Sequence, residues 1–135
     1  MSKFLVFILF APLMLVIDTT QTIPTELVGE WASEASEFNG GPISKGTAVY
    51  VGTNGFAAII SAPPPIGAKG SATYNAKKRV LTITMINDGK QIGPYDFTYD
   101  RKSKTLRSRK GEFGNEPFAR RRDRIPKHVL EEFKQ

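Results

Sequence analysis

Residues 27–31 read Leu-Val-Gly-Glu-Trp, and this segment decides the fold that we expect. We interpret it as the first strand of a small antiparallel barrel that begins with Gly29 and a buried Trp31. After Trp31, short alternating apolar runs are interrupted about every 8–12 residues by Gly, Pro, Asn or Asp. This spacing is typical of an all-β sandwich or barrel, and no stretch before Pro126 has a helical pattern.

Turn residues separate the expected strands. Asn54-Gly55 lies between two apolar runs and predicts a hairpin, because tight hairpin turns need positive φ angles. The three prolines at positions 63–65 lack backbone donors, so this segment is expected to be an exposed loop or rim. Residues 34–42 are read as a loop, and residues 75–78 and 101–104 as charged turns. The expected strands are 27–33, 47–51, 56–60, 70–74, 79–86, 95–100, 105–110 and 117–121.

Seven or eight short strands in one small domain favour a closed up-and-down barrel, because closure removes exposed sheet edges. A sandwich remains the alternative, since the pattern does not give the strand order. The segment that starts at Pro126 fits a short amphipathic helix, with Val129, Leu130 and Phe133 on one side. The sequence therefore predicts an all-β fold with a short C-terminal helix.

The N-terminal residues have the three zones of a secretory signal peptide: Lys3, the apolar run Phe4–Ile17 and the polar segment Asp18–Thr22. A membrane-spanning helix needs about 20 apolar residues, which is more than this run supplies. The segment lacks an Ala-x-Ala cleavage pattern, so an uncleaved membrane anchor remains the alternative. We expect a secreted or periplasmic monomer divided into signal peptide 1–22, barrel domain 23–125 and helix 126–135.

The chain has few side chains that could catalyse a reaction or bind a metal ion. There is no cysteine, which excludes a disulfide framework, a thiol nucleophile and cysteine metal ligands. The single histidine, His128, follows a basic run and is read as a surface residue, since no nucleophile or third group accompanies it. We find no cofactor motif and no metal-ligand set, so the sequence predicts a protein without enzyme activity, cofactor or metal.

The Gly29-Glu30-Trp31 motif, followed by a meander of short strands, resembles the Gly-x-Trp opening of the calycin barrels. These are the lipocalins, fatty-acid-binding proteins and avidin-like proteins. The resemblance implies that Trp31 closes one end of the barrel and that a late-strand arginine packs across its face. Arg107, Arg109 and Arg120 are candidates for that arginine. The chain departs from the biotin binders because it has only one tryptophan.

Positive charge is concentrated toward the C-terminal end of the chain. Residues 101–135 hold 12 of the 19 Lys and Arg residues but 5 of the 13 Asp and Glu residues. We expect a basic patch that suits anionic lipid headgroups, polyanionic glycans or an acidic protein, unless the segment only keeps the protein soluble. Nucleic acid is not expected, because the chain has a secretory signal pattern and its aromatic residues are not interleaved with the arginines as stacking platforms would require. The patch would comprise Arg107, Arg109, Arg120, Arg121, Arg122 and Arg124.

Two function classes follow from these features. The first is a non-enzymatic, lipocalin-like barrel that binds a small apolar or amphiphilic ligand, with Tyr50, Tyr95, Phe97 and Tyr99 lining the site if they point inward. A barrel this small can instead be filled by its own side chains, in which case its surface does the work. The second is a secreted inhibitor or immunity-type protein that binds an acidic protein partner through exposed loops and the arginine cluster.

Overall fold

The computed structural model of the protein describes residues 23–133, so the predicted signal segment and the last two residues of the chain lie outside it. The described chain starts with a 3-10 helix, η2 (Thr25–Leu27), and ends with an α-helix, α2 (Lys127–Phe133). The strands between them are β1 (Gly29–Ser33), β2 (Glu37–Phe38), β3 (Ile43–Val51), β4 (Phe56–Ala62), β5 (Ile66–Asn75), β6 (Val80–Asn87), β7 (Lys90–Asp100), β8 (Thr105–Ser108) and β9 (Phe118–Arg122).

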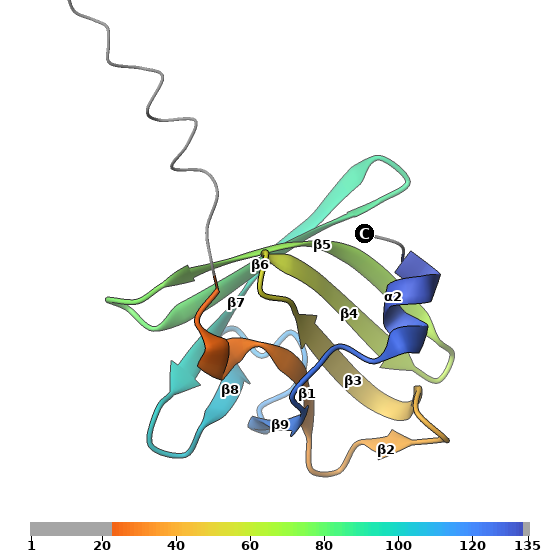
Figure 1. The fold of residues 1–135 in the computed structure, drawn as a ribbon, viewed down its shortest axis with the longest axis horizontal. Coiled ribbons are helices and arrows are strands. Elements are labelled where there is room, and N and C mark those ends of the chain that lie inside the picture. Colours follow the sequence, from red (N-terminus) through yellow and green to blue (C-terminus); the bar gives the residue numbers. More distant parts are fainter. Residues whose placement is uncertain (1–22, 134–135) are drawn as a thin grey trace, which may run out of the picture.

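The strands form one antiparallel sheet that closes on itself (Figure 1). β3 to β9 pair in chain order, and β1 pairs with both β3 and β9. β2 is a two-residue addition on β3 and stands outside the ring, which leaves eight strands in the barrel. The fold is thus an eight-stranded up-and-down barrel with a short C-terminal helix, as the sequence predicted, and the sandwich alternative is wrong.

The turn residues act as their sequence predicted. β3 and β4 form a hairpin in which Val51 faces Ala57, and Gly55 takes a φ of +89° in the turn between them. The side-chain oxygen of Asn54 accepts a hydrogen bond of 3.1 Å from the backbone N–H of Phe56. The three prolines lie between β4 and β5, outside the ladder. The prediction of a loop over residues 34–42 was wrong at β2, and β3, β5 and β7 begin earlier than expected.

The interior of the barrel is filled with the protein's own side chains. On β6 the alternating residues Leu81, Ile83 and Met85 are buried, as their period of two predicted. Trp31 and Phe97 are likewise buried, being 1% and 0% exposed. The inner cluster consists of Ile23, Leu27, Trp31, Val49, Val51, Ala57, Ile59, Ala68, Ala72, Leu81, Ile83, Met85, Phe97, Tyr99, Leu106 and Phe118. Because these side chains are almost wholly excluded from solvent, they occupy the space in which a lipocalin-like ligand would lie.

A second apolar cluster lies on the outer wall of β3 and β4. Every residue from Ala48 to Val51 is buried, because the odd-numbered ones face inward while Ala48 and Tyr50 face α2. Val129 of α2 is fully buried against this wall, and Leu130 and Phe133 flank it. The helix predicted from Pro126 therefore packs across the outside of the barrel (Figure 1).

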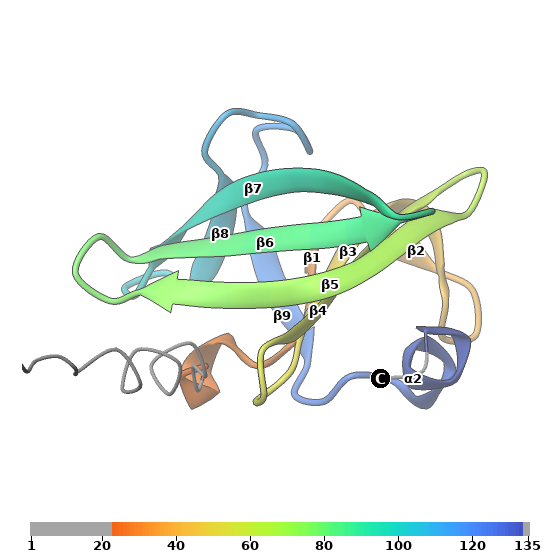
Figure 2. The same ribbon diagram turned by 90° about the horizontal axis from the view of Figure 1, so that it is seen from above.

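The up-and-down order gives the barrel two distinct ends. One end, which we call the η2 end, carries η2, the β3–β4, β5–β6 and β7–β8 turns, and the residues that follow β9. The N–H of Ile23 bonds the carbonyl of Thr53 there at 3.3 Å, and the N–H of Tyr99 bonds that of Arg79 at 2.8 Å. The opposite end carries the β4–β5, β6–β7 and β8–β9 connections, and α2 lies toward it (Figure 2).

Candidate functional site

Trp31 lies in the barrel interior beside η2. Its Nε1 donates a hydrogen bond of 2.9 Å to the carbonyl oxygen of Leu27, which fastens the indole to the segment that precedes β1. The ring of Tyr99 meets it edge to face, with 6.2 Å between the ring centroids. An indole with its N–H satisfied in this way can be buried without an unpaired donor. Trp31 is therefore part of the packed core at the η2 end.

Gly29 is required by the close approach of β9 to the start of β1. Its φ is +135°, and a Cβ at this position would lie 2.3 Å from the carbonyl oxygen of Arg122. The same Cβ would lie 3.0 Å from Cδ of Arg120, so backbone and side chain together occupy its place. The glycine of the Gly-x-Trp motif thus lets β9 lie directly against β1.

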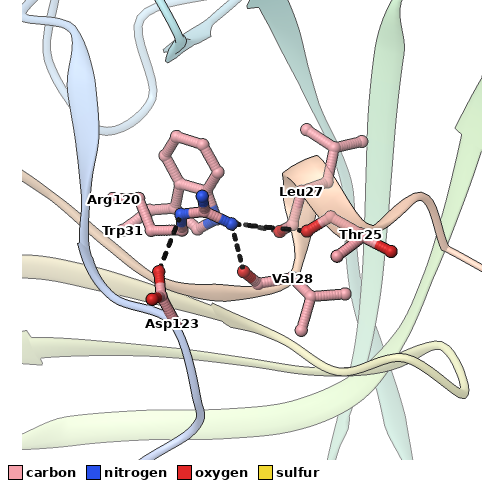
Figure 3. A network of polar contacts seen from close by, with 6 residues as sticks. All are labelled: Thr25, Leu27, Val28, Trp31, Arg120 and Asp123. Carbon is pink, nitrogen blue, oxygen red and sulfur yellow. Dashed lines mark hydrogen bonds and ion pairs between the residues drawn. The ribbon is translucent and has the colours of Figure 1, made fainter.

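Of the three candidate arginines, Arg120 is the one that lies opposite Trp31 in the strand register. The two residues are cross-strand partners between β1 and β9. Nη1 of Arg120 donates to the carbonyl oxygens of Thr25 at 3.3 Å and Val28 at 3.2 Å, and its Nε lies 3.4 Å from Asp123 (Figure 3). Arg120 therefore ties β9 to both sides of η2, and it closes this end of the barrel together with Trp31.

The two arginines after Arg120 point to other places, because β9 contains a bulge. Trp31 pairs with Arg120 and Glu30 pairs with Arg122, which leaves Arg121 as the extra residue. The guanidinium of Arg121 lies 5.0 Å from the ring centroid of Phe38, and its Nη1 donates to the carbonyl of Ser33 at 2.9 Å. Nε of Arg122 lies 3.6 Å from Oε1 of Glu30. Three consecutive arginines therefore make three separate internal contacts.

The predicted basic patch is consequently not gathered into one free surface. Arg107, on β8, donates to the carbonyl of Asn115 in the loop that precedes β9. Arg109 and Arg124 are exposed, and their side chains make no hydrogen bond or ion pair with another residue of the described chain. Arg109 follows β8 toward the opposite end of the barrel, whereas Arg124 follows β9 at the η2 end.

Glu30 is a structural residue that the sequence pattern did not identify. It is 1% exposed on the outer wall of β1, opposite Tyr50 on β3 and Arg122 on β9. Its Oε2 and the hydroxyl of Tyr50 have no hydrogen-bond partner within residues 23–133. Burial first, and the nearby Glu30 carboxylate second, raise the pKa of Tyr50 above its ordinary value. No apolar period marks this site, so only the strand register could have revealed it.

The main cluster of unpaired positive charge lies on two hairpin turns of the η2 end. We call its six residues the turn cations: Lys77, Lys78, Arg79, Arg101, Lys102 and Lys104. All six are exposed, and no side chain among them forms a hydrogen bond or ion pair with another described residue. The two turns are close in space, since Arg79 and Arg101 both act on the hydroxyl of Tyr74 and lower its pKa against the larger effect of burial.

A hollow of about 620 Å³ lies beside these turns, over the closed mouth of the barrel. Burial and then the carboxylate of Glu26 raise the pKa of Tyr99, whose ring forms part of the wall. Three cations and two carboxylates contribute to the same wall. The lining residues are Glu26, Trp31, Tyr99, Arg101, Lys104, Ala119, Arg120 and Asp123.

The four aromatic residues predicted to line a ligand site do not share one cavity. Tyr50 faces outward and lies beneath α2, so it does not meet the condition of pointing inward under which it would line the site. Phe97 and Tyr99 lie in the inner cluster, and Tyr95 packs against it. Phe113, from the loop that follows β8, stacks on Phe97 at 5.8 Å and meets Tyr95 edge to face at 4.9 Å. The rings of Tyr95, Phe97 and Tyr99 are therefore packed against other side chains of the protein, in the space where a ligand would have to lie.

Another hollow, of about 500 Å³, lies on the outer wall across β4, β5 and β6. Phe56 and Ile86 contribute its apolar surface, and Ile86 is 54% exposed. His128, the single histidine, is half-buried near Gly41. Within residues 23–133 there is no group of three or more histidine, aspartate or glutamate side chains placed to hold a metal ion. The helices of this part of the chain are too short or too polar to cross a membrane.

Comparison with protein-family models, with curated proteins and with solved structures finds no match to this chain. Of the expected resemblance, the structure bears out the eight-stranded antiparallel up-and-down barrel.

Proposed function

We propose that this protein is a non-enzymatic binding protein that works outside the cytoplasm and contacts an anionic partner through its outer surface. The observation that carries this proposal is the filled interior: Trp31, Phe97 and Phe118 are at most 2% exposed within the barrel. A carrier of the lipocalin type needs an internal space for its ligand. Since side chains occupy that space here, the outside of the barrel is the surface available for recognition.

The turn cations supply the charge for such recognition. The arginines of β9 are engaged in contacts with Val28, Ser33 and Glu30, whereas the turn cations have no such partners within the described chain. Exposed charges of one sign steer an oppositely charged partner and align it on contact. The proposal that this interaction occurs outside the cytoplasm is supported by the secretory signal pattern of residues 1–22.

A small amphiphilic ligand at the barrel mouth is the second candidate. The hollow of about 620 Å³ over Trp31 and Tyr99 is large enough for a small molecule, and Arg101 and Lys104 at its wall would face an anionic group. Such a ligand would bind on the closed end of the barrel and not within it. This retains the ligand-binding function expected from the sequence but moves its site to the surface.

A pair of charge-matched variants tests the proposal. The turn-reversed variant carries K77E, K78E, R101E and K102E, and the control variant carries K45E, K90E, R109E and K110E at the opposite end. Both sets contain three lysines and one arginine, all exposed. We expect the turn-reversed variant to bind fluorescent polyglutamate at least tenfold more weakly than the parent, and the control variant to stay within threefold.

Equal weakening in both variants would contradict the proposal, because net charge alone would then explain binding. Native mass spectrometry distinguishes the second candidate, a small ligand at the barrel mouth, from recognition of a partner by the turn cations. A small-molecule adduct that persists on the folded parent protein and disappears on denaturation would favour the ligand at the mouth. Absence of any adduct together with the expected variant pattern supports recognition by the surface.

A further inference from the structure

We infer that the η2 end of the barrel docks on an anionic lipid bilayer, with the turn cations facing the headgroups and the barrel axis directed away from the membrane. This inference rests on the proposed function and names its partner. It is carried by two observations: the place where the described chain begins and the unequal distribution of charge between the two ends of the barrel.

The chain enters the barrel at the η2 end. Ile23 is 2% exposed, and its N–H donates to the carbonyl of Thr53 in the β3–β4 turn at 3.3 Å, so this first described residue is fixed there. The apolar run Phe4–Ile17 precedes it in the sequence. Six residue steps join Ile17 to Ile23, and at about 3.5 Å per step they reach at most about 21 Å. Retained as an uncleaved anchor, which is the alternative to a cleaved signal peptide, this run would therefore keep the η2 end of the barrel close to the headgroups.

The acidic residues of the η2 end are fewer than its cations, so they offset the charge of the six turn cations only in part. Both Asp100 and Asp123 have other partners: Asp100 accepts hydrogen bonds from the backbone N–H groups of Lys102 at 2.9 Å and Ser103 at 3.3 Å, and Asp123 lies against Arg120. The bonds to Asp100 lower its pKa, so it stays ionised within the turn. Glu26, which acts on Tyr99 and Tyr74, is the remaining carboxylate.

The opposite end of the barrel has no comparable excess of positive charge. Its connections carry both signs along the same loops, namely Glu34, Asp88, Lys90, Arg109, Lys110, Glu112 and Glu116. A charge on a protein is felt by a membrane over about 8 Å at physiological ionic strength. Lysines and arginines therefore strengthen membrane binding only where the surface that carries them lies close to the headgroups. The end from which the N-terminal segment leaves is also the end that carries the unpaired cations.

An anionic bilayer fits these observations better than an acidic protein, because the bilayer is the partner to which an apolar N-terminal segment would bring the barrel. Tyr74, which is half-buried near the end of β5, also lies at this end. Tyrosine is enriched where proteins meet the membrane–water interface, since its ring is apolar and its hydroxyl is polar.

Vesicle flotation of the full-length chain tests the inference. The vesicles contain either phosphatidylcholine alone or phosphatidylcholine with 30% phosphatidylglycerol, roughly the anionic content of many membranes. The apolar run contributes equally to both, so the measured quantity is the ratio of the two partition coefficients. We expect anionic vesicles to bind the parent at least tenfold more strongly, the turn-reversed variant to lose this preference, and the control variant to keep it.

A second measurement uses the parent chain alone and does not depend on how the variants fold. Lysines are labelled with a water-soluble amine reagent in the presence of each vesicle type. We expect Lys77, Lys78 and Lys102 to be protected by anionic vesicles, while Lys45, Lys90 and Lys110 remain reactive. Salt at 0.5 M should abolish the protection, because the Debye length then falls to a few ångströms, roughly.

Three results would overturn the inference: equal partition into both vesicle types, equal loss of preference in both variants, or protection of the opposite-end lysines. If the turn-reversed variant loses polyglutamate binding while the parent shows no preference for anionic vesicles, the partner is an acidic protein. In that case the proposed function stands and the membrane inference fails. If the turn-reversed variant binds both polyglutamate and anionic vesicles as well as the parent does, both fail.

Discussion

Arg122 and Glu30 form an ion pair across β9 and β1 in which one partner is half-exposed and the other is buried. Nε of Arg122 lies 3.6 Å from Oε1 of Glu30, and the side chains are 55% and 1% exposed. Burying a carboxylate is costly unless a charge or hydrogen bonds accompany it. The pair therefore holds the end of β9 against the barrel wall just before the chain turns toward α2.

Removal of Arg122 should be costly for this reason. We expect Arg122→Ala to lower the free energy of unfolding by about 1–3 kcal/mol, because Glu30 is left buried and charged without its partner. Arg124→Ala, which removes an exposed arginine two residues away, should change it by less than about 0.5 kcal/mol. Urea denaturation measures both. The double variant with Glu30→Gln should recover most of the loss, and failure to recover would contradict the pairing.

Arg120 gives a second prediction, through its bonds to η2. Arg120→Ala removes the donor for the carbonyls of Thr25 and Val28, so unfolding should become easier by about 1–2 kcal/mol. The emission of Trp31 should also shift to longer wavelength, because the arginine no longer covers the closed mouth of the barrel. Arg109→Ala is the matched control, and an identical spectrum in both variants would contradict this role.

The buried hydroxyl of Tyr50 gives a prediction about stability at neutral pH. Because no well-formed hydrogen bond from the described chain reaches this hydroxyl, although Glu30 acts on it, Tyr50→Phe should change the free energy of unfolding by less than about 1 kcal/mol at neutral pH. Thermal unfolding with far-ultraviolet circular dichroism checks this. A large loss of stability would show that the hydroxyl makes a contact that the side chains of the described residues do not supply.

Alkaline pH should destabilise the protein through the same tyrosine. The pKa of Tyr50 is raised by burial and by Glu30 and Glu132, while Arg122 lowers it. A raised pKa means that the unfolded chain ionises first, so stability is full below about pH 10 and is lost as the pH rises above it. Urea midpoints measured between pH 8 and pH 11 should therefore fall less steeply for Tyr50→Phe than for the parent. Parallel curves would contradict the assignment.

Gly29 gives a prediction about the Gly-x-Trp motif. Gly29→Ala places a Cβ 2.3 Å from the carbonyl of Arg122, so we expect a loss of at least about 2 kcal/mol in the free energy of unfolding. Gly40→Ala is the control, because Gly40 also has positive φ but a Cβ there meets nothing within 4 Å. The control should lose about 1 kcal/mol, and equal losses would show that strain alone matters.

Most of the strands were predictable from the sequence because each depends on local signals, whereas the pattern left their order open between a barrel and a sandwich. Alternation of Leu81, Ile83 and Met85 gave the inward face of β6, and Asn54-Gly55 gave the β3–β4 hairpin. By contrast, β2 has only two residues, Glu37 and Phe38, which pair locally with Lys45 and Ile43 of β3 and show no alternating apolar run. Ser36, which precedes β2, lies close to Gly46 of β3, where a Cβ would be 2.6 Å from Oγ of Ser36. Residues 34–42 have no sequence pattern that predicts a strand.

The site was harder to predict than the fold, since it depends on register and on which turns share an end. Arg120, Arg121 and Arg122 read as one basic cluster, but the bulge in β9 sends them to three different contacts. Tyr50 was a candidate for the ligand site only if it pointed inward. It points outward, and the buried run Ala48–Val51 is covered on both faces because α2 packs outside it. Lys78 and Arg101 occur in ordinary charged turns, and the up-and-down order alone places them together.

A barrel filled by its own side chains also has a consequence for the speed of recognition. Since Trp31, Phe97 and Phe118 leave no interior to open, a partner meets a surface that is already formed and need not wait for a rearrangement. The association rate should then be set by collision and by the electric field of the turns. Added salt would lower the association rate constant much more than it would raise the dissociation rate constant.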